Sequence, residues 1–209
     1  MTSNRQWHVL LIGGPSGVGK SSLALELGQR YATNVTQLDD LQAALESVTT
    51  PAQLPLLHYW RTNWSEFSAF TDEEHVSHFL DVSRQVFTPL ITAVIADRLD
   101  GGMPAIIEGG FVLPELAAQP DYKGQSNEGR VHALFVDETE EAQIAANVVA
   151  REGRGGPFDA ALPARTSWLK GIWLREECRR LNLPYVAARP WDSLADRAVT
   201  ALALSEGEG

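Results

Sequence analysis

The amino-acid sequence predicts an α/β fold built on a parallel sheet with crossover helices. Short β-rich runs bounded by turn residues alternate along the chain with longer segments of helical period. Most of the short runs are apolar on both faces, as strands in the middle of a parallel sheet are. With 209 residues, 44% of them hydrophobic, the chain can bury one sizeable core, so we expect one domain spanning residues 1–209.

The expected elements follow in order along the chain. Strands are predicted at residues 7–13, 34–39, 104–109, 131–137 and 184–188. Helices are predicted at 20–32, about 74–99, 138–151, about 165–181 and 191–204, with a kink at Pro89. The stretches 49–73 and 152–167 do not fit the alternation. Long connections in a compact domain tend to be functional loops or lids, so we expect one at each place.

Composition narrows the class of partner. The formal net charge of −10 argues against a nucleic acid, whose protein partners usually carry a basic patch. Cys178 is the single cysteine and forms no internal disulfide, which suits a reducing cytoplasm. The N-terminus lacks the pattern of a secretory signal, and we expect no apolar run long enough to span a bilayer. The sequence therefore predicts a cytoplasmic protein without a membrane or nucleic-acid partner.

One stretch, "GGPSGVGKSS" at 13–22, carries a specific chemistry. Gly14 is followed after four residues by Gly19-Lys20-Ser21, which is the P-loop pattern, and it lies between a predicted strand and a predicted helix. Glycines let backbone N–H groups wrap a phosphate chain, and the helix presents its positive end to the same anion. We expect Lys20 to reach the β and γ phosphates and Ser21 to bind Mg²⁺. The predicted phosphate-binding residues are Gly14, Ser16, Gly17, Val18, Gly19, Lys20, Ser21 and Ser22.

Other classes of P-loop protein fit less well. The sequence has no N-K-x-D motif, by which a GTPase reads its base, although ATP and GTP are not otherwise distinguished. Motor and AAA-type ATPases need a longer chain and usually a strand that ends in paired acids, whereas Glu108 stands alone. A small-molecule kinase that uses ATP and Mg²⁺ remains the best fit.

Three carboxylates are candidates for the catalytic chemistry. Asp39 and Asp40 are expected at the end of the second strand, and Glu108 at the end of the third. Ligands of open α/β sheets gather beyond these strand ends, so the three acids should face the phosphate chain. Asp39 is the favoured general base for a hydroxyl, with Asp40 and Glu108 as alternatives that the sequence leaves open.

The insertion at about 49–100 is rich in aromatic side chains and is the expected acceptor-binding region. Its candidate acceptor contacts are His58, Tyr59, Trp60, Arg61, Trp64 and Arg84. Arg151 and Arg154 lie where the third predicted helix, 138–151, gives way to a glycine-bearing segment, the expected lid at about 152–167. Arginines on a lid can neutralise the transferred phosphoryl group. Arg189 and Trp191, after the last strand, are candidates for stacking on adenine.

The runs "GGPSGVGKSSLA", "LDDL", "AREGRGG" and "YVAARPWDSLADRAVTALA" resemble the small P-loop kinases that include chloramphenicol phosphotransferase, shikimate kinase and gluconate kinase. The piece "AIIEGGFVLPEL" is similar to a segment of 2-phosphoglycerate kinases. The resemblance implies a three-layer α/β/α sandwich with strand order 2-3-1-4-5 and a lid over ATP. It also implies the roles given above to Lys20, Ser21, Asp39 and the two lid arginines. The "EGG" segment lacks neighbouring basic residues for a phosphorylated acceptor, which weighs against the second likeness.

The leading hypothesis is a kinase for a hydroxyl of a small metabolite or natural product. A phosphorylated sugar acid such as 2-phosphoglycerate, bound by Arg61 and Arg84, is the alternative acceptor. A nucleotide-binding regulatory or toxin-like module and an ATPase that activates water are the rivals from other classes. A homodimer is compatible with the sequence.

Overall fold

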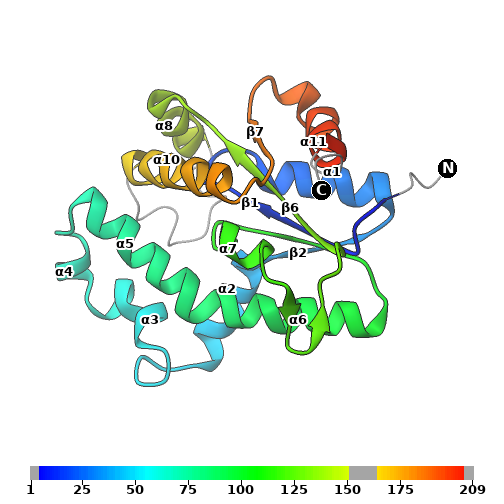
Figure 1. Cartoon of the computed structure of the whole chain (residues 1–209). Helices are drawn as coiled ribbons and strands as arrows, with labels where there is room; N and C mark the ends of the chain where they lie inside the picture. The colour runs from blue at the N-terminus through cyan, green and yellow to red at the C-terminus, as the bar shows by residue number, and fades with distance from the viewer. Residues whose placement is uncertain (1–4, 151–163, 205–209) are drawn as a thin grey trace.

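The computed structural model describes residues 5–150 and 164–204 and has a five-stranded parallel sheet at its centre (Figure 1). The sheet consists of β1 (Val9–Gly13), β2 (Asn34–Gln37), β3 (Ala105–Glu108), β6 (Val131–Asp137) and β7 (Tyr185–Ala187). Their order is β2-β3-β1-β6-β7, and every neighbouring pair is parallel. The predicted fold class and strand order are confirmed.

The sheet separates two apolar cores. In β1, Val9 and Leu11 belong to one core and Leu10 and Ile12 to the other, because successive side chains of a strand point to opposite faces. All four are fully buried. A strand that is apolar on both faces is stable only between two layers of helices, which explains the continuous apolar run "VLLI".

Helices cover both faces. On one face, α1 (Lys20–Tyr31) and α11 (Leu194–Leu204) pack together, with Leu23 and Ala198 in the shared core. On the other face, α6 (Thr88–Gly101) and α10 (Ala164–Arg180) contribute Ile91 and Leu174 to the second core. The helix α8 (Glu141–Ala150) packs against α10. The result is the expected three-layer arrangement (Figure 1).

The chain turns into a helix earlier after β2 than the sequence indicates. β2 ends at Gln37 and α2 runs over Leu38–Val48, so Asp39 and Asp40 lie in the first helical turn and do not end the strand as predicted. The correction has a physical reason: carboxylates are stabilised near the positive N-terminal end of a helix. The insertion continues as α3 (Pro55–Thr62), α4 (Trp64–Phe67) and α5 (Asp72–Val82).

The helices α5 and α6 form one continuous helix of 30 residues, Asp72–Gly101, in which the π-helical turn η1 (Ser83–Phe87) lies between them. Thr71 and Glu74 form a capping box at its start. Pro89 lies in the first turn of α6, directly after the π turn, and proline lacks the N–H that a regular helix would use there. Length and composition would let this helix cross a membrane, contrary to the sequence expectation, yet Phe87, Ile91 and Ile95 are buried in the core.

Some short elements have no sequence signal. These are α7 (Pro114–Ala117) and the hairpin strands β4 (Asp121–Tyr122) and β5 (Gln125–Ser126). The 3₁₀ turn η2 (Trp191–Ser193) falls within the helix predicted at 191–204 and precedes α11. Two-residue strands are too short to show a period. Tyr122 anchors the hairpin because its ring is fully buried and its hydroxyl donates to the Leu116 carbonyl at 2.9 Å.

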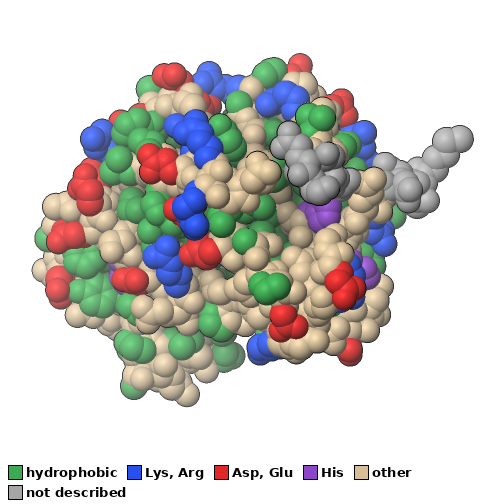
Figure 2. Space-filling view, in the orientation of Figure 1, with side chains coloured by type: hydrophobic (Ala, Val, Ile, Leu, Met, Phe, Trp, Pro, Cys, Tyr) green, Lys and Arg blue, Asp and Glu red, His purple; other side chains and the backbone are tan. Residues whose placement is uncertain are grey.

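On the face drawn in Figure 2, Lys and Arg side chains are interspersed with Asp and Glu.

Replacing Phe87 tests the packing of the π turn. The Phe87 ring is fully buried and stacks on Phe111 with ring centroids 3.8 Å apart. We expect Phe87→Ala to lower the free energy of unfolding by about 3–5 kcal/mol, because it leaves a cavity in the core. Urea denaturation measures the change. Met103→Ala, at an exposed position, is the control and should change stability by less than about 0.5 kcal/mol; equal losses in the two variants would contradict this packing.

Candidate active site

The turn between β1 and α1 has the backbone that its glycines predict. Gly14, Gly17 and Gly19 have φ values of 144°, 80° and 84°, a region that other residues rarely adopt. A Cβ on Gly14 would lie 2.3 Å from the Val136 carbonyl oxygen of β6. Gly19 is the N-cap of α1, and no described side chain caps it. The first amides of α1 therefore remain available to an anion.

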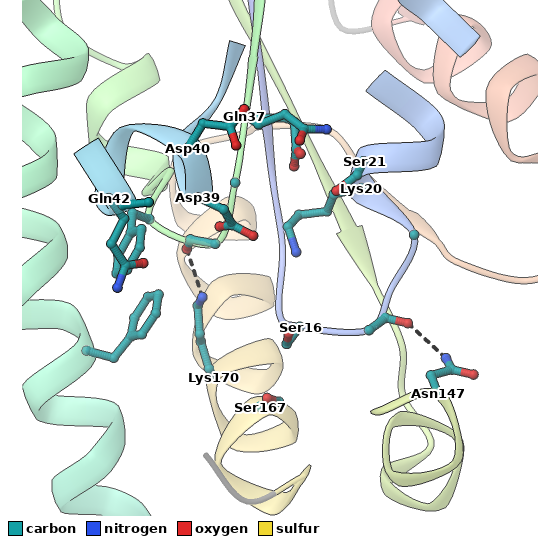
Figure 3. A pocket seen from close by; sticks show the side chains of 18 of the residues that line it. Ser16, Lys20, Ser21, Gln37, Asp39, Asp40, Gln42, Asn147, Ser167 and Lys170 are labelled. Atoms are coloured by element: carbon teal, nitrogen blue, oxygen red, sulfur yellow. Dashed lines mark hydrogen bonds between the residues drawn. The ribbon is translucent and has the colours of Figure 1, made fainter. Parts of the chain in front are cut away.

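The functional side chains of the turn face a cavity of about 1010 Å³ (Figure 3). Its wall includes Ser16, Gly17, Gly19, Lys20, Ser21 and Ser22. The Lys20 ammonium lies within the turn and donates to the Pro15 carbonyl at 2.7 Å. Gly14 and Val18 do not line the cavity that the described residues form. Gly14 packs closely against β6, and Val18 is fully buried in the core.

The three candidate carboxylates line the same cavity. Glu108 ends β3, is 3% exposed and pairs in register with Gln37 of β2 and Ile12 of β1. Asp39 and Asp40 reach the cavity from the first turn of α2. Figure 3 shows the Asp39 side chain turned toward the side of the cavity where Lys20 and Lys170 also point. The strand edge thus brings the acids and the phosphate-binding turn together, as the parallel topology requires.

Helix α10 contributes a buried cation that sequence reasoning missed. Lys170 is 5% exposed, and its Nζ donates to the Gly110 carbonyl at 2.8 Å and lies 3.6 Å from the centroid of the Phe79 ring. Gly110 provides the space, since a Cβ there would lie 3.2 Å from Nζ. The expectation that the "EGG" segment has no basic neighbour is wrong. The available signal was spacing: Lys170, Leu174 and Cys178 recur every four residues on the buried face of α10.

The insertion supplies fewer contacts to the cavity than predicted. Arg61 lines it, pairs with Glu46 at 2.7 Å and packs over the Trp60 ring. His58 and Arg84 lie outside the wall that the described residues form. His58 is buried 2.9 Å from the Thr49 hydroxyl, and Arg84 pairs with Glu115 at 3.0 Å. Residue type alone suggested an acceptor contact for each of them, but Thr49 holds His58 and Glu115 holds Arg84 away from the cavity.

The aromatic side chains of the insertion mostly pack on one another. Trp60 is buried in the core, and the Tyr59 ring stacks on Phe70 with centroids 5.9 Å apart. Trp64 is 51% exposed. The predicted lid arginines, Arg151 and Arg154, lie outside the described residues.

The segment after β7 contacts the phosphate-binding turn. Trp191 lines the cavity, and its ring occupies the space beside Gly19, where a Cβ would come within 2.4 Å of the ring. Arg189 forms two hydrogen bonds to the Glu138 carboxylate, at 2.7 and 2.9 Å. Burial raises the pKa of Glu138, but hydrogen bonds from Arg189 and from the backbone N–H of Glu140 outweigh it and hold that pKa below its ordinary value.

This ion pair predicts a pH dependence of stability. A carboxyl whose pKa is lower in the folded protein stabilises the fold above its unfolded pKa, about 4.3, and the contribution is lost as pH falls through the folded pKa. We therefore expect Glu138→Gln to destabilise the protein more at about pH 7 than at about pH 3.5. Urea denaturation at both pH values measures the difference. A gap between wild type and variant that stays constant would contradict the assigned pKa shift.

The sequence is partly similar to those of several proteins named 2-phosphoglycerate kinase. The chain is 32% identical over 108 residues to a 2-phosphoglycerate kinase of Pyrococcus horikoshii, covering 51% of this chain and 36% of that protein. It is 33% identical over 111 residues to one of Methanopyrus kandleri, covering 52% of this chain and 34% of that protein. The chain thus spans about a third of the length of these curated relatives.

The structure of a gluconokinase from Sinorhizobium meliloti superposes with a TM-score of 0.53 at 18% identity, covering 98% of this chain and 97% of that one. No family model matches the sequence. The chain therefore has the α/β fold of a P-loop kinase structure and partial sequence similarity to proteins named 2-phosphoglycerate kinase.

Proposed function

We propose that the chain is a kinase that transfers the γ-phosphoryl group of ATP to a hydroxyl of a small acceptor in the presence of Mg²⁺. One observation carries the proposal: the turn that bears Lys20 and Ser21 opens into the cavity that Asp39 and Glu108 also line. The names of the relatives and the gluconokinase fold support the same reaction class. The proposal places the enzyme in the cytoplasm, with a small molecule as its partner.

The nucleotide would occupy the end of the cavity formed by the turn. Amides of the glycine turn and of the first turn of α1 would surround the phosphates, and Lys20 would exchange its contact with Pro15 for one with the β and γ phosphates. Trp191 is exposed enough, at 43%, to stack on adenine. Arg189 is engaged with Glu138, so it would position Trp191 from that side and leave the stacking to the indole.

The donors present fit a magnesium ion. Mg²⁺ prefers oxygen ligands and usually takes one or two from protein, with the rest from water and substrate phosphates. The Ser21 hydroxyl and nearby carboxylates line one cavity, and no cluster of three or more His, Cys, Asp or Glu occurs in the described part of the chain. When bound, the ion supplies charge neutralisation between the phosphates.

Asp39 is the proposed general base. Its carboxylate would accept the proton of the acceptor hydroxyl as the oxygen attacks phosphorus, while Lys20 stabilises the charge that develops on the phosphoryl oxygens. Its position in the first turn of α2 places the carboxylate beside the positive end of that helix. Glu108 and Asp40 would then orient the acceptor or serve the metal through water.

Lys170 favours an acceptor that carries a carboxylate or a phosphate. Its ammonium is held at the cavity wall beside Gly110, and an anionic substituent bound there would place a neighbouring hydroxyl near Asp39. The proteins named 2-phosphoglycerate kinase make 2-phosphoglycerate the first acceptor to test. Arg61 also lines the cavity and would be a second cationic contact for the acceptor. Arg84, which was predicted together with it, does not line the cavity as the described residues form it.

Replacing Asp39 tests the assignment of the base. We expect Asp39→Asn to lower kcat for acceptor-dependent ADP release by about 10²–10⁴-fold while leaving the dissociation constant for Mg-ATP nearly unchanged. Asp40→Asn, which removes the same charge from the neighbouring position, is the control and should retain more activity. Full activity in Asp39→Asn would refute Asp39 as base. Rapid ADP release by wild type without any acceptor would favour an ATPase instead.

Replacing Lys170 tests the acceptor class. We expect Lys170→Met to raise KM for 2-phosphoglycerate by about 10–100-fold, the value of a hydrogen bond to a charged group, while KM for ATP stays constant. Lys123→Met, at an exposed position in the hairpin, removes the same charge and should behave as wild type. Steady-state kinetics with both substrates separates the two constants. An increase confined to KM for ATP would place Lys170 in the nucleotide site.

A further inference from the structure

A side chain of α8 is hydrogen-bonded to the phosphate-binding turn. Asn147 donates from Nδ2 to the Gly17 carbonyl at 2.9 Å, and its Oδ1 accepts a hydrogen bond from Gln143, one helical turn earlier, at 2.8 Å. The second bond fixes which end of the amide faces the turn. Figure 3 shows the contact at the edge of the cavity, which Asn147 also lines.

The bond fixes more than the carbonyl. The peptide unit between Gly17 and Val18 is planar and trans, so its C=O and N–H point in opposite directions. Holding the carbonyl toward α8 therefore holds the Val18 N–H away from α8. An anion-binding turn depends on several N–H groups that point the same way before the anion arrives.

Gly17 is the position that most needs an external support. Its φ of 80° is one of several that glycine adopts at similar energy, so the residue itself does not select the orientation of the following peptide. The Cβ of Asn147 would lie 3.4 Å from a Cβ on Gly17, so α8 packs directly against this point of the turn. Trp191 packs against the turn at Gly19.

We infer that Asn147 is a positioning residue that preorganises the turn for the triphosphate, an inference that rests on the proposed kinase function. It acts through the peptide it holds and need not touch the nucleotide. The consequence is a specific loss: without its amide, Mg-ATP binds more weakly, while the acceptor site is unaffected and the protein stays folded.

The experiment compares three variants by calorimetric titration with Mg-ATP. Asn147→Ala removes the donor, Asn147→Asp keeps the shape but loses the donor when ionised, and Val149→Ala is the control on the exposed side of the same helix. We expect Asn147→Ala to weaken Mg-ATP binding by about fivefold, because ATP must then order a turn that is no longer held, at a cost of about 1 kcal/mol. KM for the acceptor should match that of Val149→Ala, and the free energy of unfolding should fall by no more than about 1.5 kcal/mol, the upper value for one neutral hydrogen bond.

The pH profile of Asn147→Asp distinguishes positioning from simple charge repulsion. At about pH 8 the carboxylate faces a carbonyl and the bound phosphates, so this variant should bind Mg-ATP more weakly than Asn147→Ala. As pH falls to about 4, near the ordinary pKa of aspartate, the carboxyl becomes protonated and can donate to Gly17, so it should then bind more tightly than Asn147→Ala at the same pH. Relief of repulsion alone would bring it only to the level of the alanine variant, and that outcome would overturn the inference.

The outcomes for this inference and for the proposed function are separable. Wild-type protein that does not bind Mg-ATP would refute the proposed function itself. Wild-type binding together with unchanged binding by Asn147→Ala would refute only the role of Asn147. A rise in KM for the acceptor equal to the loss of Mg-ATP affinity would also refute it, since positioning of the turn predicts the loss of Mg-ATP affinity alone.

Discussion

The left-handed glycine backbone between β1 and α1 is the constraint on which the site depends. Because Gly19 caps α1 with φ near 84° and without a described side-chain cap, the positive end of the helix is directed into the cavity. The fully buried strand β1 delivers the turn to the edge of the sheet where β2 and β3 also end. Glu108 at the end of β3 and Asp39 directly after β2 therefore line the same cavity as the phosphate-binding turn.

Charge in the cavity is arranged around buried cations. Lys20 and Lys170 are 8% and 5% exposed, and a buried ammonium must be compensated by hydrogen bonds and by negative groups. Each donates to a backbone carbonyl, Lys20 to Pro15 and Lys170 to Gly110, and Asp39 and Glu108 line the same space. One ammonium group lies within the phosphate-binding turn and the other beside the "EGG" segment. A phosphoryl donor and an anionic acceptor are the pair of ligands that such an arrangement would draw together.

The part of the site that sequence predicted is the part that local chemistry determines. The P-loop spacing requires a strand before it and a helix after it, and parallel strands place Glu108 beside β1, so these positions follow from short-range rules. Lys170 was missed because it lies 150 residues from Lys20, and its approach to Gly110 depends on how α10 crosses the sheet. His58 and Arg84 were misplaced for the converse reason, since Thr49 and Glu115 hold them through contacts that residue type alone does not reveal. The end of the second strand was predicted two residues too late, at 39 where β2 ends at Gln37, a usual uncertainty for element boundaries.

Glycine gives the turn its shape but does not by itself fix the orientation of the turn's peptide groups. This explains why α8 and the segment after β7 pack against the turn. Each glycine that permits inward-pointing amides also permits other orientations, so a turn made of glycines has little intrinsic preference for the binding form. Asn147 restricts the peptide after Gly17, and the Trp191 ring fills the space beside Gly19. Glu138 and Arg189 in turn join the start of the α8 region to the segment that carries Trp191. The supports at Gly17 and Gly19 are therefore connected to each other, and a change that moved α8 relative to β7 would alter the turn at both points.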